Sequence, residues 1–295
     1  MSVIIGTSNH DGTGSSENLT ADNGALISGY FNDDGITVYP YETFSGISFD
    51  SVQIQSDTWN NKNYKEAKVD GNYEAITIDN IIDLDIHNQS DLGFSHIELL
   101  NTKRGNIDTS GVDSDDSIFI GVYSNSSGWS NKFTIDTGEG NDSVTLANVQ
   151  GSQYTRFDIN LGTGDDQLDI STLSSSYKSY QERIAEGGDG FDVLITNGSN
   201  NVTFSGFEMV KGTGFNSTLS ITKDILDNNS DNDVGLIITN IDVDFSSALN
   251  YTTQAVDAEH STYLEQHGFD VDTFDLVTVD DGEYTLLIQH DDLLS

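Results

Sequence analysis

The chain has 295 residues, with 49 Asp or Glu against 11 Lys or Arg, so its formal net charge is −38. This charge argues against nucleic acids and anionic membranes as ligands, because both are bound through clustered cations and the only adjacent basic pair is Lys103 and Arg104. The hydrophobic content of 35% suffices for a folded core, and the absence of Cys excludes disulfides and thiolate metal sites. Metal ions, water or a basic partner must therefore compensate most carboxylates.

Residues 1–104 are expected to form a β-rich N-terminal or capping part. Residues 76–86, ITIDNIIDLDI, alternate apolar and polar residues in the manner of half-buried strands. Residues 5–12 either form a Gly-rich entry loop, which we favour, or a degenerate copy of the acidic turns described next. The start, MSVIIGTSNHDG, has no basic residue, and the chain has no long apolar run, so we expect neither an N-terminal signal peptide nor membrane insertion.

Four acidic turns recur along residues 105–240. GEGNDSVTL begins at Gly138, GTGDDQLDI at Gly162 and GGDGFDVLI at Gly187, and the weaker copy VDSDDSIFI begins at Val112. The aspartates that close the turns are Asp116, Asp142, Asp166 and Asp192, spaced 26, 24 and 26 residues apart. Each turn precedes an alternating run, and a second strand-like segment lies between turns.

A unit of about 25 residues with two strands cannot bury its apolar face alone, so the fold class that we predict is an all-β parallel β-solenoid with these turns along one edge. Stacked aspartates would repel each other at a strand separation of about 4.8 Å, and a dication between coils would remove that repulsion. Calcium suits such a site, because it accepts many carboxylate and carbonyl oxygens in flexible geometry. The predicted ligands are Asp142, Asp166 and Asp192, with Asp116, Asp165 and Asp189 as secondary candidates and the turn glycines Gly138, Gly140, Gly162, Gly164, Gly188 and Gly190 as carbonyl donors.

These turns resemble the nonapeptide G-G-x-G-x-D-x-U-x of the repeats-in-toxin (RTX) family of secreted bacterial calcium-binding proteins. Residues 187–195 match it in full, and residues 137–145 and 161–169 lack only the first Gly. The chain departs from the family's usual array in having one nonapeptide per coil. The segments that begin at Phe94 and Phe204, with Glu98 and Glu208 at the same offset, look like stretches that accompany calcium repeats in RTX adhesins.

Residues 241–295 are expected to form a β-rich C-terminal cap, with a short helix at residues 261–267. The tail Asp291–Ser295 is similar to the C-terminal type I secretion signals of the RTX family. The resemblance thus implies a bacterial protein found outside the cell or on its surface, exported without an N-terminal signal peptide.

The patterns favour a secreted structural or adhesive protein over an enzyme. It would be a surface-layer, matrix or filament subunit, or a cell-attachment module. We expect it to fold on binding calcium and to form a homo-oligomer or polymer. A cell-surface polysaccharide is a further expected partner. The alternatives are an extracellular carbohydrate-active enzyme on a β-helix and a diffusible calcium-binding effector. A polysaccharide lyase needs cations to neutralise its substrate, and Arg156, Lys178 and Arg183 are few and scattered. His260 and His267 lack a zinc-binding HExxH pattern, and residues 227–233 lack the Gly and Glu of an EF-hand.

Overall fold

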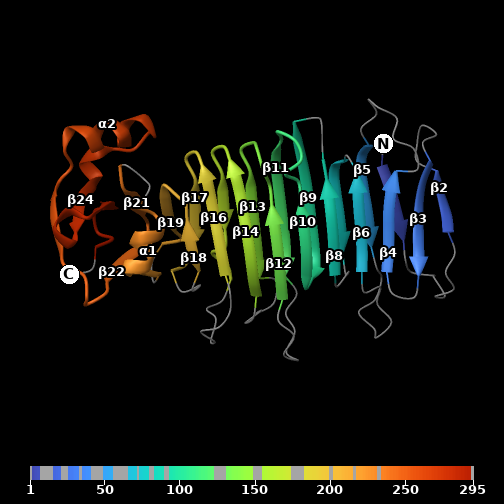
Figure 1. Cartoon of the computed structure of the whole chain (residues 1–295), viewed down its shortest axis with the longest axis horizontal. Coiled ribbons are helices and arrows are strands. Elements are labelled where there is room, and N and C mark those ends of the chain that lie inside the picture. Colours follow the sequence, from blue (N-terminus) through green and yellow to red (C-terminus); the bar gives the residue numbers. More distant parts are fainter. Residues whose placement is uncertain are drawn as a thin grey trace.

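A computed structural model of the chain describes the backbone in the following ranges, with most side chains described from Val69 onward: 2–6, 16–20, 26–32, 35–40, 49–55, 66–71, 73–79, 83–89, 93–122, 131–148, 155–173, 183–198, 202–214, 217–230 and 234–293. The described residues form an elongated stack of coils, with the N-terminal strands at one end and the C-terminal cap at the other (Figure 1).

Two large sheets build the stack, and most successive strands alternate between them. The first, sheet A, has 13 described strands in the order β1 (Ser2–Gly6), β5 (Phe49–Gln55), β7 (Tyr73–Asp79), β9 (Phe94–Thr102), β11 (Asp115–Val122), β13 (Ser143–Asn148), β15 (Gln167–Asp169), β17 (Val193–Thr196), β19 (Met209–Gly212), β21 (Leu236–Thr239), β25 (Tyr284–Gln289), β24 (Phe274–Val279) and β23 (Tyr251–Ala255).

The second, sheet B, has 10 described strands in the order β18 (Thr203–Ser205), β16 (Arg183–Asp189), β14 (Thr155–Thr163), β12 (Asn131–Asp136), β10 (Arg104–Asp108), β8 (Asp83–Asn88), β6 (Glu66–Gly71), β4 (Gly35–Pro40), β3 (Leu26–Asn32) and β2 (Ser16–Thr20). From β4 to β18 its neighbours run parallel, whereas β2, β3 and β4 form an antiparallel meander at the N-terminal end.

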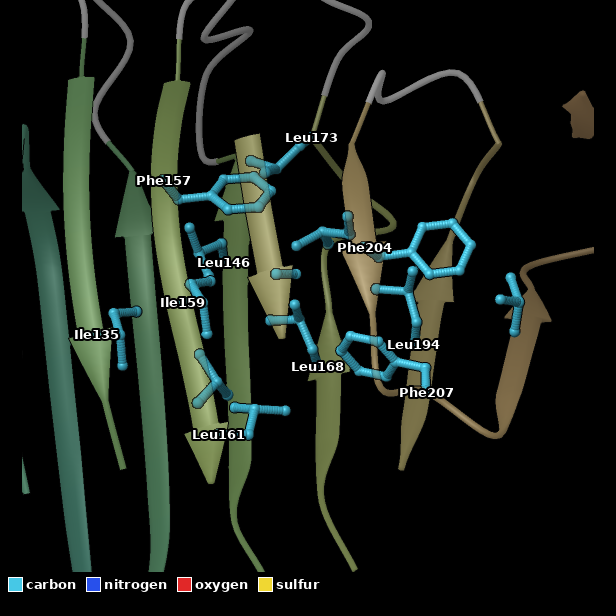
Figure 2. Packing of buried hydrophobic residues seen from close by; sticks show 14 of the residues in the cluster. Ile135, Leu146, Phe157, Ile159, Leu161, Leu168, Leu173, Leu194, Phe204 and Phe207 are labelled. Atoms are coloured by element: carbon cyan, nitrogen blue, oxygen red, sulfur yellow. The ribbon is translucent and has the colours of Figure 1, made fainter. Parts of the chain in front are cut away.

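The core lies between the two sheets and consists of rows of like side chains stacked in register. In sheet B, Phe133 pairs with Phe157 and Ile135 with Ile159, and all four are buried. Phe157, Ile159 and Leu161 of β14 point into the core, where Leu146 and Leu168 of sheet A lie (Figure 2). Alternation with period two places every second residue inward, which is why the sequence pattern of each coil predicts its strands.

The C-terminal end is closed by a change of strand direction. β25 runs parallel to β21 but antiparallel to β24, and β24 is antiparallel to β23. Helix α2 (Ala258–Gln266) covers the outer face of sheet A there, and its buried Leu264 belongs to a second apolar cluster with Met209, Ile237, Phe274, Leu276 and Leu287. A small parallel pair, β20 (Thr218–Ile221) and β22 (Asp242–Phe245), completes the cap with helix α1 (Lys223–Asn228) and the 3-10 turns Val271–Thr273 and Asp280–Gly282.

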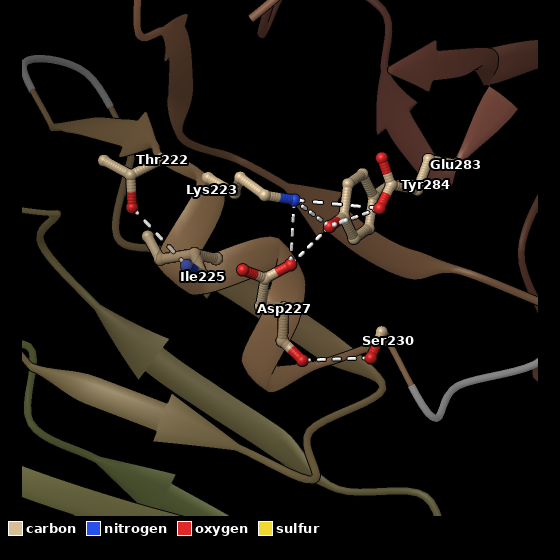
Figure 3. A network of polar contacts seen from close by, with 7 residues as sticks. All are labelled: Thr222, Lys223, Ile225, Asp227, Ser230, Glu283 and Tyr284. Carbon is tan, nitrogen blue, oxygen red and sulfur yellow. Dashed lines mark hydrogen bonds and ion pairs between the residues drawn. The ribbon is translucent and has the colours of Figure 1, made fainter. Parts of the chain in front are cut away.

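A polar network joins α1 to the last strand (Figure 3). Lys223 Nζ lies 3.1 Å from Asp227 Oδ1 and 3.7 Å from Glu283 Oε1, and the Tyr284 hydroxyl contacts both Lys223 and Asp227. The tail follows β25 into the fold, since Leu293 forms a bridge with Val243 and packs against the main core.

The predicted all-β parallel solenoid with Gly/Asp turns along one edge and a β-rich C-terminal cap is confirmed. Residues 76–86 do belong to the solenoid, divided between β7 and β8 in opposite sheets. The Gly-rich entry loop predicted for residues 5–12 is wrong at its start, because Ile5 and Gly6 lie in strand β1. Residues 7–12 lie outside the described part. The predicted helix begins at Ala258 rather than residue 261, because the Asp257 carboxylate caps it by accepting the Glu259 and His260 N–H groups. Among the described helices, none is both long and apolar enough to cross a membrane.

Candidate metal centre

Four Gly/Asp turns lie one above another where sheet B strands pass into sheet A. The register pairs Ser117 with Ser143, Ser143 with Gln167 and Gln167 with Val193. The residue before each of these positions is the aspartate that closes a turn. The strand register therefore stacks Asp116, Asp142, Asp166 and Asp192 in one column, as the phased repeats predict.

The turn glycines are required because each coil approaches the next at this edge. Gly164 has φ +132°, and a Cβ placed on it would lie 1.8 Å from the Gly140 carbonyl oxygen. Gly162 has φ +104°, and a Cβ placed on it would lie 1.9 Å from the Gly138 carbonyl oxygen. Gly188 and Gly190 repeat this contact with Gly162 and Gly164, so carbonyl oxygens line the stack from turn to turn. Each carbonyl has two lone pairs, so those that already accept a backbone N–H retain one for a cation.

The stacked aspartates form a continuous hydrogen-bonded ladder. Oδ1 of Asp142 accepts the backbone N–H of Asp116 at 2.7 Å, and Oδ1 of Asp166 accepts that of Asp142 at 2.7 Å. Oδ1 of Asp192 accepts the N–H of Asp166 at 2.8 Å. Each carboxylate thus bonds to the backbone of the preceding coil with one oxygen only.

The second oxygen of every ladder aspartate is buried without a hydrogen-bond partner. This holds for Oδ2 of Asp116, Asp142, Asp166 and Asp192, whose residues are between 0% and 2% exposed. The Thr137 hydroxyl, which lies against Asp142 and lowers its pKa, donates to the Leu161 carbonyl at 2.7 Å. A buried carboxylate oxygen left unsatisfied is costly, so each ladder position needs a proton or a cation.

Burial and mutual repulsion raise the pKa of the ladder carboxyls. Burial, reinforced by the neighbouring ladder aspartates, raises the pKa of Asp142 and of Asp192 to about 7. Burial and the charges of Asp165 and Asp115 raise the pKa of Asp166 to about 6. Burial also raises the pKa of Asp116, against the lowering effect of the nearby Thr109, Ser95 and Ser114 hydroxyls. Near neutral pH the metal-free ladder is therefore poorly compensated.

The ladder has defined ends that the sequence did not reveal. At the N-terminal end, the hydroxyls of Ser95 and Ser114 donate to Oδ1 of Asp116 at 2.7 and 3.1 Å. At the other end, Oε2 of Glu208 accepts the Asp192 N–H at 2.7 Å, so glutamate continues the column where no nonapeptide follows. The recurrence of Glu at residues 98 and 208 after similar apolar segments was the available signal for Glu208, but its role as the ladder's end was missed.

Two of the three secondary candidates, Asp165 and Asp189, lie on the outside of the turns, apart from the buried column. Asp165 belongs to a second, exposed ladder: the Asn141 N–H donates to Asp115 Oδ1, the Asp165 N–H to Asn141 Oδ1, and the Phe191 N–H to Asp165 Oδ1, at 2.7 to 2.9 Å. Asp116, the weaker copy, is a full member of the buried ladder. The structure therefore brings together Asp116, Asp142, Asp166 and Asp192 and separates them from Asp165 and Asp189.

The donor set fits a hard cation only if the backbone supplies most ligands. Across the described residues, no three Asp, Glu or His side chains converge on one point. Two neighbouring ladder aspartates offer one unpartnered oxygen each, and the stacked glycine carbonyls of the same turns are further oxygen donors. A mixture of carboxylate and carbonyl oxygens is the set that calcium accepts and zinc does not favour.

The other candidate groups serve structural roles. Arg183 is 1% exposed and donates from Nε to the Thr155 carbonyl at 2.8 Å, inside the solenoid. His267 stacks on Phe191 with ring centroids 3.9 Å apart, and His260 contacts Asp257 at 2.7 Å. Asp227 of the rejected EF-hand segment bonds to Lys223 and Tyr284, whereas residues 231–233 and Lys178 lie outside the described part.

Comparison of the chain with protein-family models, with curated proteins and with solved structures finds no match.

Proposed function

We propose that this chain is a secreted, calcium-stabilised structural or adhesive protein that resembles the RTX proteins. The observation that carries the proposal is the column of buried carboxylates, each with one oxygen bonded to the coil before it and one oxygen unpartnered. Four such carboxylates in consecutive coils are an arrangement that protons satisfy in acid and cations satisfy at neutral pH.

Pairs of neighbouring aspartates would hold the ions. Asp116 with Asp142, Asp142 with Asp166, and Asp166 with Asp192 would each present two unpartnered Oδ2 atoms, and the glycines of the same turns would add carbonyl oxygens. When bound, calcium supplies the positive charge that these residues lack. The protein contributes burial of the site and the positive-φ turns that aim the carbonyl oxygens along the stack.

This arrangement makes folding depend on the surroundings. Where calcium is scarce, as inside a cell, folding would bury four uncompensated carboxylates, so the unfolded state is favoured. A chain that stays unfolded inside the cell can be exported in that form. Where calcium is abundant, any ion that binds only the folded state stabilises that state by mass action. The same dependence supports the extracellular location and the export without an N-terminal signal.

The elongated stack supports a structural or adhesive role (Figure 1). Its length comes from repetition of one coil, and both outer sheet faces offer long surfaces for contacts with other molecules. A stack of this kind serves as a stiff spacer or as a subunit of an assembly, and its exposed edge strand β23 needs protection or a partner.

The test is a calcium titration of chelator-stripped protein followed by far-UV circular dichroism and light scattering. We expect strand signal to appear cooperatively as calcium reaches submillimolar to millimolar concentrations, followed by a rise in scattering. Folding without a rise in scattering would support the ion site but contradict self-association. A stripped protein that is already fully folded at neutral pH, and that calcium leaves unchanged, would refute the calcium proposal.

A further inference from the structure

Strand β23, at the C-terminal end of sheet A, is exposed along its whole length. All five of its residues are exposed, although a strand of a two-sheet stack ordinarily buries every second side chain. It pairs with β24 on one side, and among the described strands it is the last of sheet A. The other side of this strand is therefore open to a further molecule.

The hydrogen bonds between β23 and β24 determine which backbone groups face the free edge. The Asp280 N–H donates to the Asn250 carbonyl at 2.8 Å, so these two residues are a hydrogen-bonded pair of the antiparallel ladder. Such pairs occur at every second residue, so Thr252 and Gln254 also bond to β24. The backbone groups that point away from β24 belong to Tyr251, Thr253 and Ala255. In the described part of the chain, these three residues have no backbone hydrogen bond on that side.

The side chains at the free edge lie on the core side of sheet A but are left uncovered. Tyr251 faces Val279 and Thr253 faces Val277, and both valines belong to the main core. Tyr251 nevertheless remains 39% exposed, with its ring stacked on Phe245 at a centroid distance of 4.3 Å. An additional strand beside β23 would extend the sheet and cover this aromatic pair.

The chain protects one sheet edge at its C-terminal end and leaves β23 unprotected. Soluble proteins ordinarily protect edge strands with charges, proline or a covering helix. Helix α1 packs on β18, the edge of sheet B, where the Asn229 side chain donates to the Phe204 carbonyl at 3.1 Å. The sequence of β23, YTTQA, has no charge and no proline. Helix α2 leaves it open, because the buried strand residues in the cluster of α2 belong to β19, β21, β24 and β25.

A second copy of β23 fits this edge. About a twofold axis at Thr253, this residue faces its own copy, and Tyr251 faces the partner's Ala255. All of these residues have outward backbone groups, so each facing pair would exchange two hydrogen bonds. Asp257 would face the partner's Leu249, so no carboxylate meets its own copy along the strand. This absence of like charges permits contact between two chains that each have a net charge of −38.

We propose that two copies join through antiparallel pairing of their β23 strands, so that sheet A continues from one stack into the next. The contact uses the same surface on both copies and therefore closes an end-to-end dimer. This inference deepens the proposed structural role and rests on its claim of self-association. It does not depend on calcium being the ion that folds the chain. One short strand buries less area than a standard interface, so the dimer should be weak and concentration-dependent.

A single introduced cysteine tests the pairing register, because the chain has none of its own. Cα atoms of a hydrogen-bonded antiparallel pair lie about 5.5 Å apart, within disulfide range, so Thr253→Cys should cross-link to its own copy on oxidation. The control is Gln254→Cys, an exposed neighbour whose two copies would lie about 8 Å apart, beyond that range. We expect about tenfold more covalent dimer from Thr253→Cys on a non-reducing gel.

Thr253→Pro tests the hydrogen bonds of the same edge. The Thr253 N–H points away from β24, so proline there removes no bond within the chain and should leave the circular dichroism signal unchanged. Sedimentation velocity should show a wild-type dimer whose dissociation constant rises about tenfold or more in the variant. All samples are first shown by circular dichroism to be folded, with calcium or, if calcium proves unnecessary, without it.

The outcomes separate this interface from the proposed function. Equal cross-linking of Thr253→Cys and Gln254→Cys would overturn the twofold register. A wild type that dimerises although Thr253→Cys does not cross-link would overturn β23 as the interface and leave self-association intact. Open polymers would mean a heterologous contact, such as one with β1 at the other end of sheet A, and would overturn the closed dimer. A folded wild type that stays monomeric, with no cross-linking of Thr253→Cys, would overturn both the interface and the self-association but not the calcium proposal.

Discussion

At the scale of single residues, the calcium proposal predicts that each ladder aspartate destabilises the fold without the ion and stabilises it with the ion. Asp142→Asn keeps an oxygen that can accept the Asp116 N–H but removes a buried charge. At pH 8 without calcium, we expect this change to stabilise the fold by on the order of 2 kcal/mol. With calcium, it should lower both the ion affinity and the stability.

Circular dichroism of the chelated proteins at pH 8, where Asp142→Asn should keep more strand signal than the wild type, and urea unfolding of the calcium-loaded proteins together measure this reversal. The matched control is Asp158→Asn, an exposed aspartate on β14, which should have little effect in either condition. An Asp142→Asn variant that is destabilised equally in both conditions would show that the carboxylate is an ordinary structural group.

Substitution of a turn glycine should destabilise the fold more than substitution of another positive-φ glycine, because the added methyl group would also collide with the next coil. Gly164→Ala places a methyl group 1.8 Å from the Gly140 carbonyl oxygen at φ +132°, so two coils must separate. We expect a loss of roughly 3 kcal/mol or more, or failure to fold. Gly268→Ala, at φ +80° with no atom within 4 Å of the new Cβ, should cost only about 1 kcal/mol. Equal losses in calcium-loaded urea unfolding would argue against close contact between the turns.

At the scale of elements, the ladder predicts how stability depends on pH. Burial raises the pKa of Asp142 and Asp192 to about 7 and that of Asp166 to about 6 in the folded state, from 3.8. The folded chain therefore holds protons that the unfolded chain has released, so stability is full below about pH 4 and falls as pH rises toward 7. The strand signal of chelated protein, measured by circular dichroism between pH 5 and pH 8, should show this fall, and Asp142→Asn should flatten it. A strand signal that rises over this range would contradict the prediction.

The C-terminal cap is stabilised by a single helix face. Leu264→Ala removes the buried α2 side chain that packs in the cluster with Met209, Ile237 and Leu287. We expect a loss of about 2 to 4 kcal/mol, measured by urea unfolding of the calcium-loaded protein. Thr262→Ala, on an exposed position of the same helix, is the control. If Leu264→Ala unfolds like this control, then α2 does not hold the outer face of sheet A.

The sequence was sufficient to predict the coils that carry the phased repeat, but not the features that lie outside the repeat. Phased turns such as Gly162–Asp166, followed by alternating residues, determine both the coil and the column of aspartates. Glu208 was missed as the ladder's end because it lies in a turn without the nonapeptide, where the phase of the repeats carries no information.

At the scale of the whole molecule, the charge of −38 raises the question of whether any cation would stabilise the fold by screening. Salt weakens repulsion among exposed carboxylates beyond a Debye length of about 8 Å at physiological ionic strength, but it does not reach buried oxygens. Magnesium also fails at a site built from backbone carbonyls and two carboxylates, because it demands near-octahedral geometry and keeps its waters. The four unpartnered Oδ2 atoms are buried, so a magnesium ion would have to shed its waters to reach them.

We therefore expect calcium to restore the strand signal of chelated protein at pH 8, whereas magnesium or sodium chloride at equal ionic strength restores little of it. Circular dichroism of the three samples provides the measurement, and addition of a calcium chelator should reverse the first. Equal recovery with sodium chloride would mean that screening of the exposed acids controls folding. Equal recovery with magnesium would mean that the turns hold a hydrated dication outside the buried ladder. Selective recovery with calcium requires dehydrated carboxylate and carbonyl ligands, which in the described part of the chain the Gly/Asp turns supply.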